Sequence, residues 1–537
     1  MLRQIALALS LVVARAHLVT VFPDVAADTR KFIDKTEQFN PITDSFYIPP
    51  TALARALPSV GVDGALHSAA TAIKEKKCLR VIAIGGSITM GASHNAKHPD
   101  RPRGPEDAYP VQLKRYLDHT FPCSDPKGHQ VLNRGVYAVT SDYWVDKLAD
   151  ALHTSSAGGV ASVDPSPLPI DMNVPTNVAQ FSAELSSAHL VVVDTSVNDA
   201  FDLVNQARGG IFNSAVAADD TLPDDAQRSA KLNEIIAIML LSRMPADTDA
   251  SPGRGVVFLG TSSHNNAWSG GLRTSDTSHA QIPIAVHYGF PFVSAMEAFG
   301  PFDTPSRAAW FLDDYRTDGC CHVTSTGHAM LARLLMHAIS VHAAPAVCCG
   351  AVGAPAGPPP TRSMPGPKLA TREDIDLYMR SHPLYVSLTK TQPSSASGFE
   401  VAEDVPGKPG LIGSRVGDTA SFVVPLDVAK SHAHVGVLHV QVVRGYDRMG
   451  TTHVSVTFSK SATQCTAELA GELASQNVDG LWETRSTQVT VETVPLNAAL
   501  LHGDTSQWSG LCVQFSIAES VPRRAENKAK LLAFVLY

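Results

Sequence analysis

Short apolar runs separated by helix-length amphipathic stretches occupy the chain from about residue 78 to residue 342. Each run is long enough for a buried strand and ends at a glycine or a polar turn. The predicted strands are Leu79–Ile84, Val131–Asn133, Leu190–Asp194, Gly255–Gly260 and Pro291–Ser294. The helical stretches include Tyr109–Thr120, Ala226–Leu241 and Thr326–His342. This alternation predicts a parallel sheet covered by helices on both faces, with ligands at the carboxyl ends of the strands.

The periodicity changes to alternating apolar and polar positions beyond residue 370. Such runs are Ala420–Val424, Val435–Val443, His453–Phe458 and Leu511–Ile517. Because turns separate them and few helical stretches intervene, they predict an antiparallel β-sandwich. The preceding stretch is rich in proline, glycine and alanine, which is typical of an extended linker.

The N-terminus has the pattern of a signal peptide. A positive Arg3 precedes the apolar run Ile5–Val13, and Ala14-Arg15-Ala16 matches an A-x-A cleavage site. The run is shorter than the roughly 20 residues that span a bilayer, and no later stretch is long and apolar enough. We therefore expect an exported protein without a membrane span.

These patterns divide the chain into five predicted parts. They are a signal peptide (1–16), a lead-in (17–75), an α/β domain (76–345), a linker (346–370) and a β-rich domain (371–537). The length of 537 residues and the apolar fraction of 44% agree with at least two folded domains. A net charge of −8 offers no basic surface for nucleic acid.

Eight cysteines agree with an oxidising compartment, where disulfides persist. Proximity along the chain favours the pairs Cys78–Cys123 and Cys465–Cys512, although sequence does not fix connectivity. The adjacent pairs Cys320/Cys321 and Cys348/Cys349 are candidates for bridging each other. No C-x-x-C spacing with companion histidines occurs, so we expect no metal and no other cofactor.

Candidate chemistry starts with Ser87, which follows a predicted strand and two glycines. A tight glycine turn can expose a hydroxyl at the top of a sheet. A nucleophilic serine needs a base, and the base needs an acceptor that fixes its tautomer. Asp318 and His322, on one turn before a predicted helix, are the candidates for acid and base.

Two further segments offer hydrogen-bond donors for a developing oxyanion. Asn198 follows the strand Leu190–Asp194, where its side-chain amide can stabilise negative charge. The loop Asn133–Ser141 follows another predicted strand, and its backbone amides can do the same.

These four segments, in this order, resemble the SGNH (GDSL-like) hydrolases. Gly85–Thr89 resembles the GDS block, Asn133–Thr140 the glycine block, Ser196–Asp199 the GxND block and Asp318–His322 the D-x-x-H block. The resemblance implies a flavodoxin-like three-layer α/β/α domain and a serine esterase that needs no metal. It implies Ser87 as nucleophile, His322 as base and Asp318 as acid. The oxyanion hole would use the amides of Ser87 and Ala138 and the side chain of Asn198.

The chain departs from the family pattern at three positions. Gly86 replaces the aspartate of GDS, and Ala138 replaces the second glycine of N-x-G-x-x-G-x-T, where Gly135 is the alternative donor. Asp318 lies four residues before His322 rather than three, so Asp314 or a Ser–His dyad stay open.

The residues favour an esterase that forms an acyl-Ser87 intermediate, and O-acyl groups of polysaccharides are a candidate substrate. Tyr446, Trp482 and Trp508 of the β-rich domain are candidates for sugar stacking, although such aromatics more often pack in the core. An O-acyltransferase of the same fold is the first alternative. A catalytically silent glycan-binding or cell-surface protein is the second.

Overall fold

The computed structural model describes part of the chain. The described residues are 48, 50–91, 93–95, 98–103, 107–153, 178–199, 224–242, 253–261, 275–299, 322–349, 370, 375, 383–404, 409–432, 436–445, 448–465, 471–481, 488–519 and 527–537. The predicted signal peptide and most of the predicted linker lie outside them. No helix within these ranges combines the length and the hydropathy that a membrane span requires.

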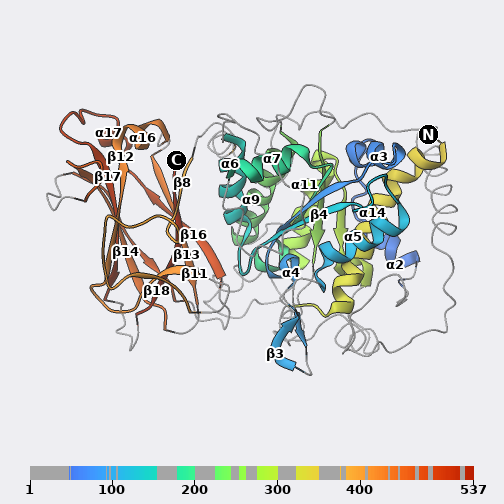
Figure 1. The fold of residues 1–537 in the computed structure, drawn as a ribbon, viewed down its shortest axis with the longest axis horizontal. Helices are drawn as coiled ribbons and strands as arrows, with labels where there is room; N and C mark the ends of the chain where they lie inside the picture. The colour runs from blue at the N-terminus through green and yellow to red at the C-terminus, as the bar shows by residue number, and fades with distance from the viewer. Residues whose placement is uncertain are drawn as a thin grey trace.

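Five parallel strands form the central sheet of the N-terminal half (Figure 1). In spatial order they are β4 (Gln130–Gly135), β1 (Arg80–Gly85), β5 (Leu190–Asp194), β6 (Gly255–Gly260) and β7 (Phe292–Ser294). Every adjacent pair is parallel. Counted along the chain, the order is 2-1-3-4-5, which is that of the flavodoxin-like fold. The predicted parallel sheet is confirmed, and each predicted strand overlaps an observed one.

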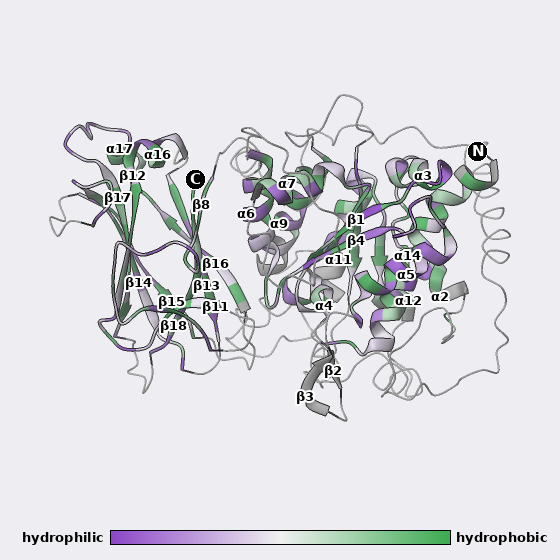
Figure 2. Cartoon of the chain, in the orientation of Figure 1, coloured by the Kyte–Doolittle hydropathy of each residue, from purple (hydrophilic) through white to green (hydrophobic). Residues whose placement is uncertain are grey.

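Helices cover both faces of this sheet and make it three layers thick. One face carries α2 (Pro50–Arg55), α3 (His67–Lys74), α5 (Tyr109–Thr120), α12 (Ala295–Phe299) and α14 (Ser325–Cys349). The other carries α6 (Ser141–His153), α7 (Val178–Ser187), α9 (Asp224–Leu241) and α11 (Ser275–Tyr288). In β1, Val81 and Ala83 face one cluster while Ile82 and Ile84 face the other. Burial on both faces explains the apolar runs of β5 and β6, whereas the edge strand β4 is half-buried and mixes apolar with polar residues, which Figure 2 colours green and purple.

Two elements extend the α/β domain beyond its predicted helices and strands. Residues 48–74 include α2 and α3, which pack into the same apolar cluster as the sheet, so this part of the predicted lead-in joins the domain core. At the other end α14 continues to Cys349, four residues into the stretch predicted as linker. A short hairpin of β2 (Ser93–Asn95) and β3 (His98–Arg103) extends from the loop after α4 (Ser87–Met90).

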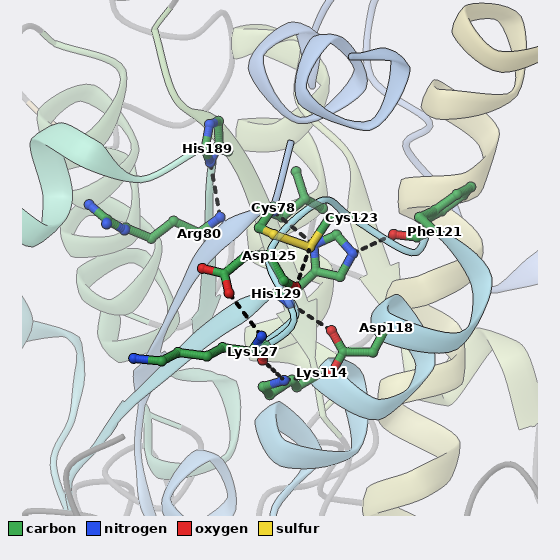
Figure 3. Close-up of a disulfide and its surroundings, with 11 residues drawn as sticks. Cys78, Arg80, Lys114, Asp118, Phe121, Cys123, Asp125, Lys127, His129 and His189 are labelled. Carbon is green, nitrogen blue, oxygen red and sulfur yellow. Dashed lines mark hydrogen bonds and ion pairs between the residues drawn. A yellow bond between two sulfur atoms is a disulfide. The ribbon is translucent and has the colours of Figure 1, made fainter. Parts of the chain in front are cut away.

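Two of the predicted disulfides are present. Cys78–Cys123 joins the start of β1 to the end of α5, and Cys465–Cys512 joins two segments of the β-rich domain. Beside the first, His129 accepts a hydrogen bond from the Leu79 amide (2.8 Å) and donates its own amide to Asp118 (2.6 Å) (Figure 3). The proposed bridge between Cys320/Cys321 and Cys348/Cys349 lies outside the described side chains.

The C-terminal half is a pair of antiparallel sheets, as the alternating pattern predicts. One sheet contains β8 (Leu384–Ser387), β10 (Glu400–Glu403), β11 (Pro409–Gly413), β13 (Val437–Arg444), β16 (Gln488–Pro495) and β18 (Ala529–Leu536). The other contains β9 (Ser395–Ser397), β12 (Thr419–Pro425), β14 (Thr451–Ser459), β15 (Glu472–Asp479) and β17 (Gly510–Ala518). Phe422, Phe515 and Phe534 pack together between them, with ring centroids 6.1 to 6.2 Å apart. Helices α16 (Leu426–His432) and α17 (Ala498–Leu501) lie at one end of the sandwich.

The two halves meet through helix α6, which lies beside β13 and β16 in Figure 1. The Asp146 side chain of α6 is 1% exposed and hydrogen-bonds to three groups of the β-rich domain. They are His439 Nδ1 (2.9 Å), Gln441 Nε2 (3.2 Å) and the Tyr537 hydroxyl (2.6 Å). Val489, Val535 and Tyr537 also belong to the apolar cluster beneath α6. The halves therefore share a packed interface as well as a peptide connection.

Candidate active site

Ser87 and His322, which are 235 residues apart, form a hydrogen-bonded pair. Strand β1 ends at Gly85, Gly86 continues in an extended conformation, and Ser87 is the first residue of α4. The Ser87 Oγ atom lies 3.0 Å from His322 Nε2, and His322 lies three residues before the start of α14. Ser87 is 8% exposed, and His322 is half-buried. A hydroxyl in this position can pass its proton to the imidazole.

Glycine is required at position 85 because the turn is crowded. A Cβ on Gly85 would overlap the Thr89 hydroxyl and the carbonyl oxygen of Asp194. The Gly86 amide donates to the same Asp194 carbonyl at 3.3 Å. Asn133 Nδ2 donates to the carbonyl of Thr89 at 2.8 Å, so the end of β4 also holds α4. These contacts fix where Ser87 lies above the sheet.

Asp194 is a buried acid beneath the serine turn. Its carboxylate accepts hydrogen bonds from Thr89 Oγ1 (2.9 Å) and Thr261 Oγ1 (2.7 Å). Burial raises the pKa of Asp194 to about 7, although both hydroxyls lower it in part. Through Thr89 this carboxylate holds α4 against the end of β5. We read it as a support for α4 that sequence reasoning did not identify.

Asn198 lies where its side chain contacts both the serine turn and the second predicted donor loop. Its Nδ2 atom donates to the Val139 carbonyl at 2.6 Å. A Cβ placed on Gly86 would overlap the same nitrogen, so Asn198 packs directly against that glycine. One N–H therefore fixes the orientation of the amide. This orientation keeps the side-chain amide of Asn198 beside the serine turn, where the predicted oxyanion would form.

The structure distinguishes the two candidate backbone donors, Ala138 and Gly135. The Gly135 amide donates to Asn133 Oδ1 at 2.9 Å, and Gly135 lies in β4 against the backbone of Met90. Ala138 has φ = 59°, in the left-handed region that favours glycine. Within the described part of the chain, neither the Ala138 amide nor the Ser87 amide donates to a backbone carbonyl. The Gly135 amide is therefore already occupied, and Ala138 stays the predicted donor.

Asp199, the acid of the Ser196–Asp199 segment, has a structural role that the sequence did not predict. It is buried and accepts hydrogen bonds from the Ser141 amide (2.8 Å), Ser229 Oγ (2.7 Å) and Asn233 Nδ2 (2.9 Å). Burial raises its pKa to about 6. Because Ser141 begins α6, Asp199 joins the loop after β5 to the loop after β4.

The acid partner of His322 is not decided by the geometry, since Asp318 and Asp314 both lie outside the described residues. Within them, buried Asp107 accepts a hydrogen bond from Ser325 Oγ at 3.0 Å. Ser325 is the first residue of α14, so Asp107 holds the chain three residues after His322. His328 lies inside α14 and is fully buried, as expected of a structural residue.

Of the three aromatic residues considered for sugar stacking, Trp508 lies among the described residues. Trp508 is half-buried, and its ring stacks on Phe458 with centroids 5.6 Å apart, at the edge of the sandwich core. This contact agrees with a packing role for Trp508. Tyr446 and Trp482 lie outside the described residues.

Comparison with known proteins gives a likeness in fold. Neither a family model nor a curated protein matches the chain. A solved two-domain esterase (CEX) active on acetylated mannans superposes with a TM-score of 0.50 and 16% identity, covering 90% of this chain and 97% of that chain. The same esterase co-crystallised with mannopentaose gives a TM-score of 0.49 and 15% identity, covering 90% of this chain and 97% of that chain. The lipase Lip_vut3 from goat rumen metagenome gives a TM-score of 0.29 and 12% identity, covering 48% of this chain and 97% of that chain. The first comparison shows a shared two-domain fold.

Proposed function

We propose that this chain is an exported serine esterase of the SGNH type that hydrolyses acyl esters through an acyl-Ser87 intermediate. The observation that carries the proposal is the 3.0 Å contact between Ser87 Oγ and His322 Nε2. It supports a nucleophile and its base at the carboxyl end of β1, where an α/β sheet places its ligands. Export is supported by the two disulfides, which persist in oxidising compartments.

In the first half of the reaction Ser87 Oγ attacks the ester carbonyl carbon while His322 Nε2 takes the hydroxyl proton. The tetrahedral intermediate collapses as His322 returns that proton to the leaving alcohol, which breaks the C–O bond of the ester. In the second half His322 removes a proton from water, and the resulting hydroxide attacks the acyl carbon. The carboxylic acid leaves, and Ser87 regains its proton.

The negative charge of each tetrahedral intermediate is on the former carbonyl oxygen. We assign its stabilisation to the backbone amides of Ser87 and Ala138 and to the side-chain amide of Asn198. Support comes from the Val139 contact that fixes the Asn198 amide (2.6 Å) and from the hydrogen bond that already occupies Gly135 (2.9 Å). Asp318 is our assignment for the acid that orients His322.

We propose O-acylated polysaccharides, acetylated ones in particular, as the substrate class. The support is a shared fold over both domains with an esterase whose name states activity on acetylated mannans. The packed contact between the α/β and β-rich halves agrees with one enzyme unit rather than an α/β enzyme with a loosely tethered module.

The test of the enzyme class is hydrolysis of p-nitrophenyl acetate by the full chain and by Ser87→Ala. We expect the variant to lose at least 10³-fold in kcat, as expected for removal of a nucleophile. Asp404→Asn, in the β-rich domain where Asp404 pairs with Lys528 and Lys530, controls for general disturbance. Turnover in Ser87→Ala at the rate of the intact protein would refute the proposal.

The substrate class is tested separately by incubating the enzyme with acetylated and deacetylated mannan, acetylated xylan and long-chain p-nitrophenyl esters. Release of acetate from an acetylated polysaccharide, and none by Ser87→Ala, is the expected result. A preference for long-chain esters with no release from any polysaccharide would contradict the proposed substrate.

A further inference from the structure

The segment from Ala138 to Asp142, which runs into the first turn of α6, contacts strand β16 of the β-rich domain, far from it in sequence. The Val489 amide donates to the Ala138 carbonyl at 2.6 Å, and Val139 and Val489 form a parallel β-bridge. The Val491 amide donates to Asp142 Oδ2 at 3.2 Å. Strand β16 is the edge of its sheet, so the outward-facing amides of β16 are available to another segment.

Ala138 is held in a conformation that an alanine disfavours. A left-handed residue with a Cβ costs roughly 1–2 kcal/mol, so external contacts must hold it. The Ala138 carbonyl is held by Val489 of β16, and the Val139 carbonyl is held by Asn198. The Ala138 N–H lies in the preceding peptide plane, and the backbone angles of Ala138, with φ at 59°, relate that plane to the fixed Ala138 carbonyl.

A side-chain bridge strengthens the same contact. The Thr140 hydroxyl donates to Asp142 and lies 3.3 Å from the Val489 carbonyl oxygen. Asp142 also accepts the Tyr143 amide at 2.8 Å. Thr140, Asp142 and Val489 are all buried, which strengthens these hydrogen bonds by excluding water. The loop is therefore bound to β16 through backbone and side-chain groups together.

We propose that strand β16 of the β-rich domain is a positioning element of the oxyanion hole, because its Val489 and Val491 amides hold the loop that presents the Ala138 amide. The proposal rests on the proposed function. It assigns to the β-rich domain a part in catalysis that does not require that domain to bind sugar. Val489 acts through Ala138 and does not touch the substrate.

The test compares two proline variants of the full chain, Val489→Pro and Thr493→Pro. Both residues belong to β16 and have the same orientation relative to β13, and Thr493 is exposed. Proline at an edge strand is tolerated where the amide faces away from the sheet. Relative to Thr493→Pro, we expect Val489→Pro to lower kcat for p-nitrophenyl acetate by about 10-fold or more, with KM changed much less. The pH at half-maximal kcat should not move, since His322 is untouched.

A second pair of variants carries the comparison if Val489→Pro does not fold. Thr140→Val removes the hydroxyl that joins Asp142 and Val489, and Thr140→Ser keeps it. We expect Thr140→Val to have a kcat at least about fivefold below that of Thr140→Ser. If the folded variants of each pair have equal kcat while Ser87→Ala is inactive, the proposed role of β16 is overturned and the proposed function stands. Full activity in Ser87→Ala would overturn the proposed function and this proposal with it.

Discussion

The Cα of Gly86 lies against the side-chain amide of Asn198, so closely that a Cβ would overlap the amide nitrogen. The family resemblance implies an aspartate at position 86, whereas this chain has glycine. Here the space is taken by the group that we assign to the oxyanion hole. Glycine at position 86 and the placement of Asn198 are therefore linked.

This contact predicts that Gly86→Ala will inactivate the enzyme by displacing Asn198. We expect kcat to fall by roughly 10²–10³-fold, which is the loss typical of one oxyanion donor. The kcat of Asn198→Ala should fall by a similar factor. In the double variant the Asn198 amide that the new Cβ would overlap is absent. The kcat of the double variant should therefore be no lower than that of either single variant. Losses that multiply in the double variant would show that Gly86 acts independently of Asn198. The measurement is steady-state hydrolysis of p-nitrophenyl acetate.

Ala138→Gly should stabilise the protein, because glycine adopts φ = 59° without the penalty that alanine bears. We expect the free energy of unfolding in urea to rise by about 1 kcal/mol. Lys76→Gly is a matched comparison, since Lys76 is exposed, precedes β1 at the end opposite Ser87 and has φ = 54°. It should gain similar stability with unchanged kcat. A loss of stability in Ala138→Gly would contradict the strain that we assign to this loop.

Stability should depend on pH through Asp194. Its folded pKa of about 7 exceeds the unfolded value of about 3.9, so the folded state binds more protons between these two values. The free energy of unfolding then falls as the pH rises from about 4 to about 7, by at most about 1.4 kcal/mol per pH unit at this site. Asp194→Asn should make this slope shallower by the share of one site, because Asp199, whose pKa burial raises to about 6, still contributes; the measurement is urea unfolding at each pH.

Asp404→Asn is the control for that pH series. Burial raises the pKa of Asp404, but hydrogen bonds from Lys528 and Lys530 outweigh it and lower the pKa to about 2. The stability that Asp404 contributes is lost only as the pH falls from about 4 to about 2, so its substitution should leave the slope between pH 4 and 7 intact. An unchanged slope in Asp194→Asn would contradict the raised pKa.

The interface between the two halves should depend on Asp146. Replacing it with alanine leaves His439, Gln441 and the Tyr537 hydroxyl without their shared acceptor in a buried environment. We expect Asp146→Ala to lower the free energy of unfolding by about 3 kcal/mol or more. Tyr537→Phe removes one of the three hydrogen bonds and should cost about 1 kcal/mol. A smaller effect for Asp146→Ala than for Tyr537→Phe would contradict this reading of the interface.

Much of the fold follows from local sequence patterns. The central strands of the parallel sheet are buried on both faces and therefore appear as unbroken apolar runs, as in Leu190–Asp194. The sandwich strands alternate, as in Thr451–Ser459. The Ser87–His322 pair was predictable because the residues of each segment are close in sequence, and the order of the segments restricts how they meet.

Contacts between distant segments left no local signal. Val489 contributes a backbone amide to the loop at Ala138, and any residue except proline has that group. Asp146 belongs to α6, where a charged residue in an amphipathic pattern would ordinarily face solvent, yet a second domain covers it. Asp194 ends a strand and could have been taken for a turn residue. Only the assembled structure identifies these roles.

The most direct test of the central assignment is the site at which a fluorophosphonate probe attaches to the folded protein. The probe reacts with an activated serine and forms a stable bond to its Oγ, so mass spectrometry of the peptides locates the nucleophile. We predict a single adduct on Ser87 in the intact protein, and none in Ser87→Ala or His322→Ala. No adduct on folded protein, or an adduct on another residue that persists in Ser87→Ala, would contradict the assignment.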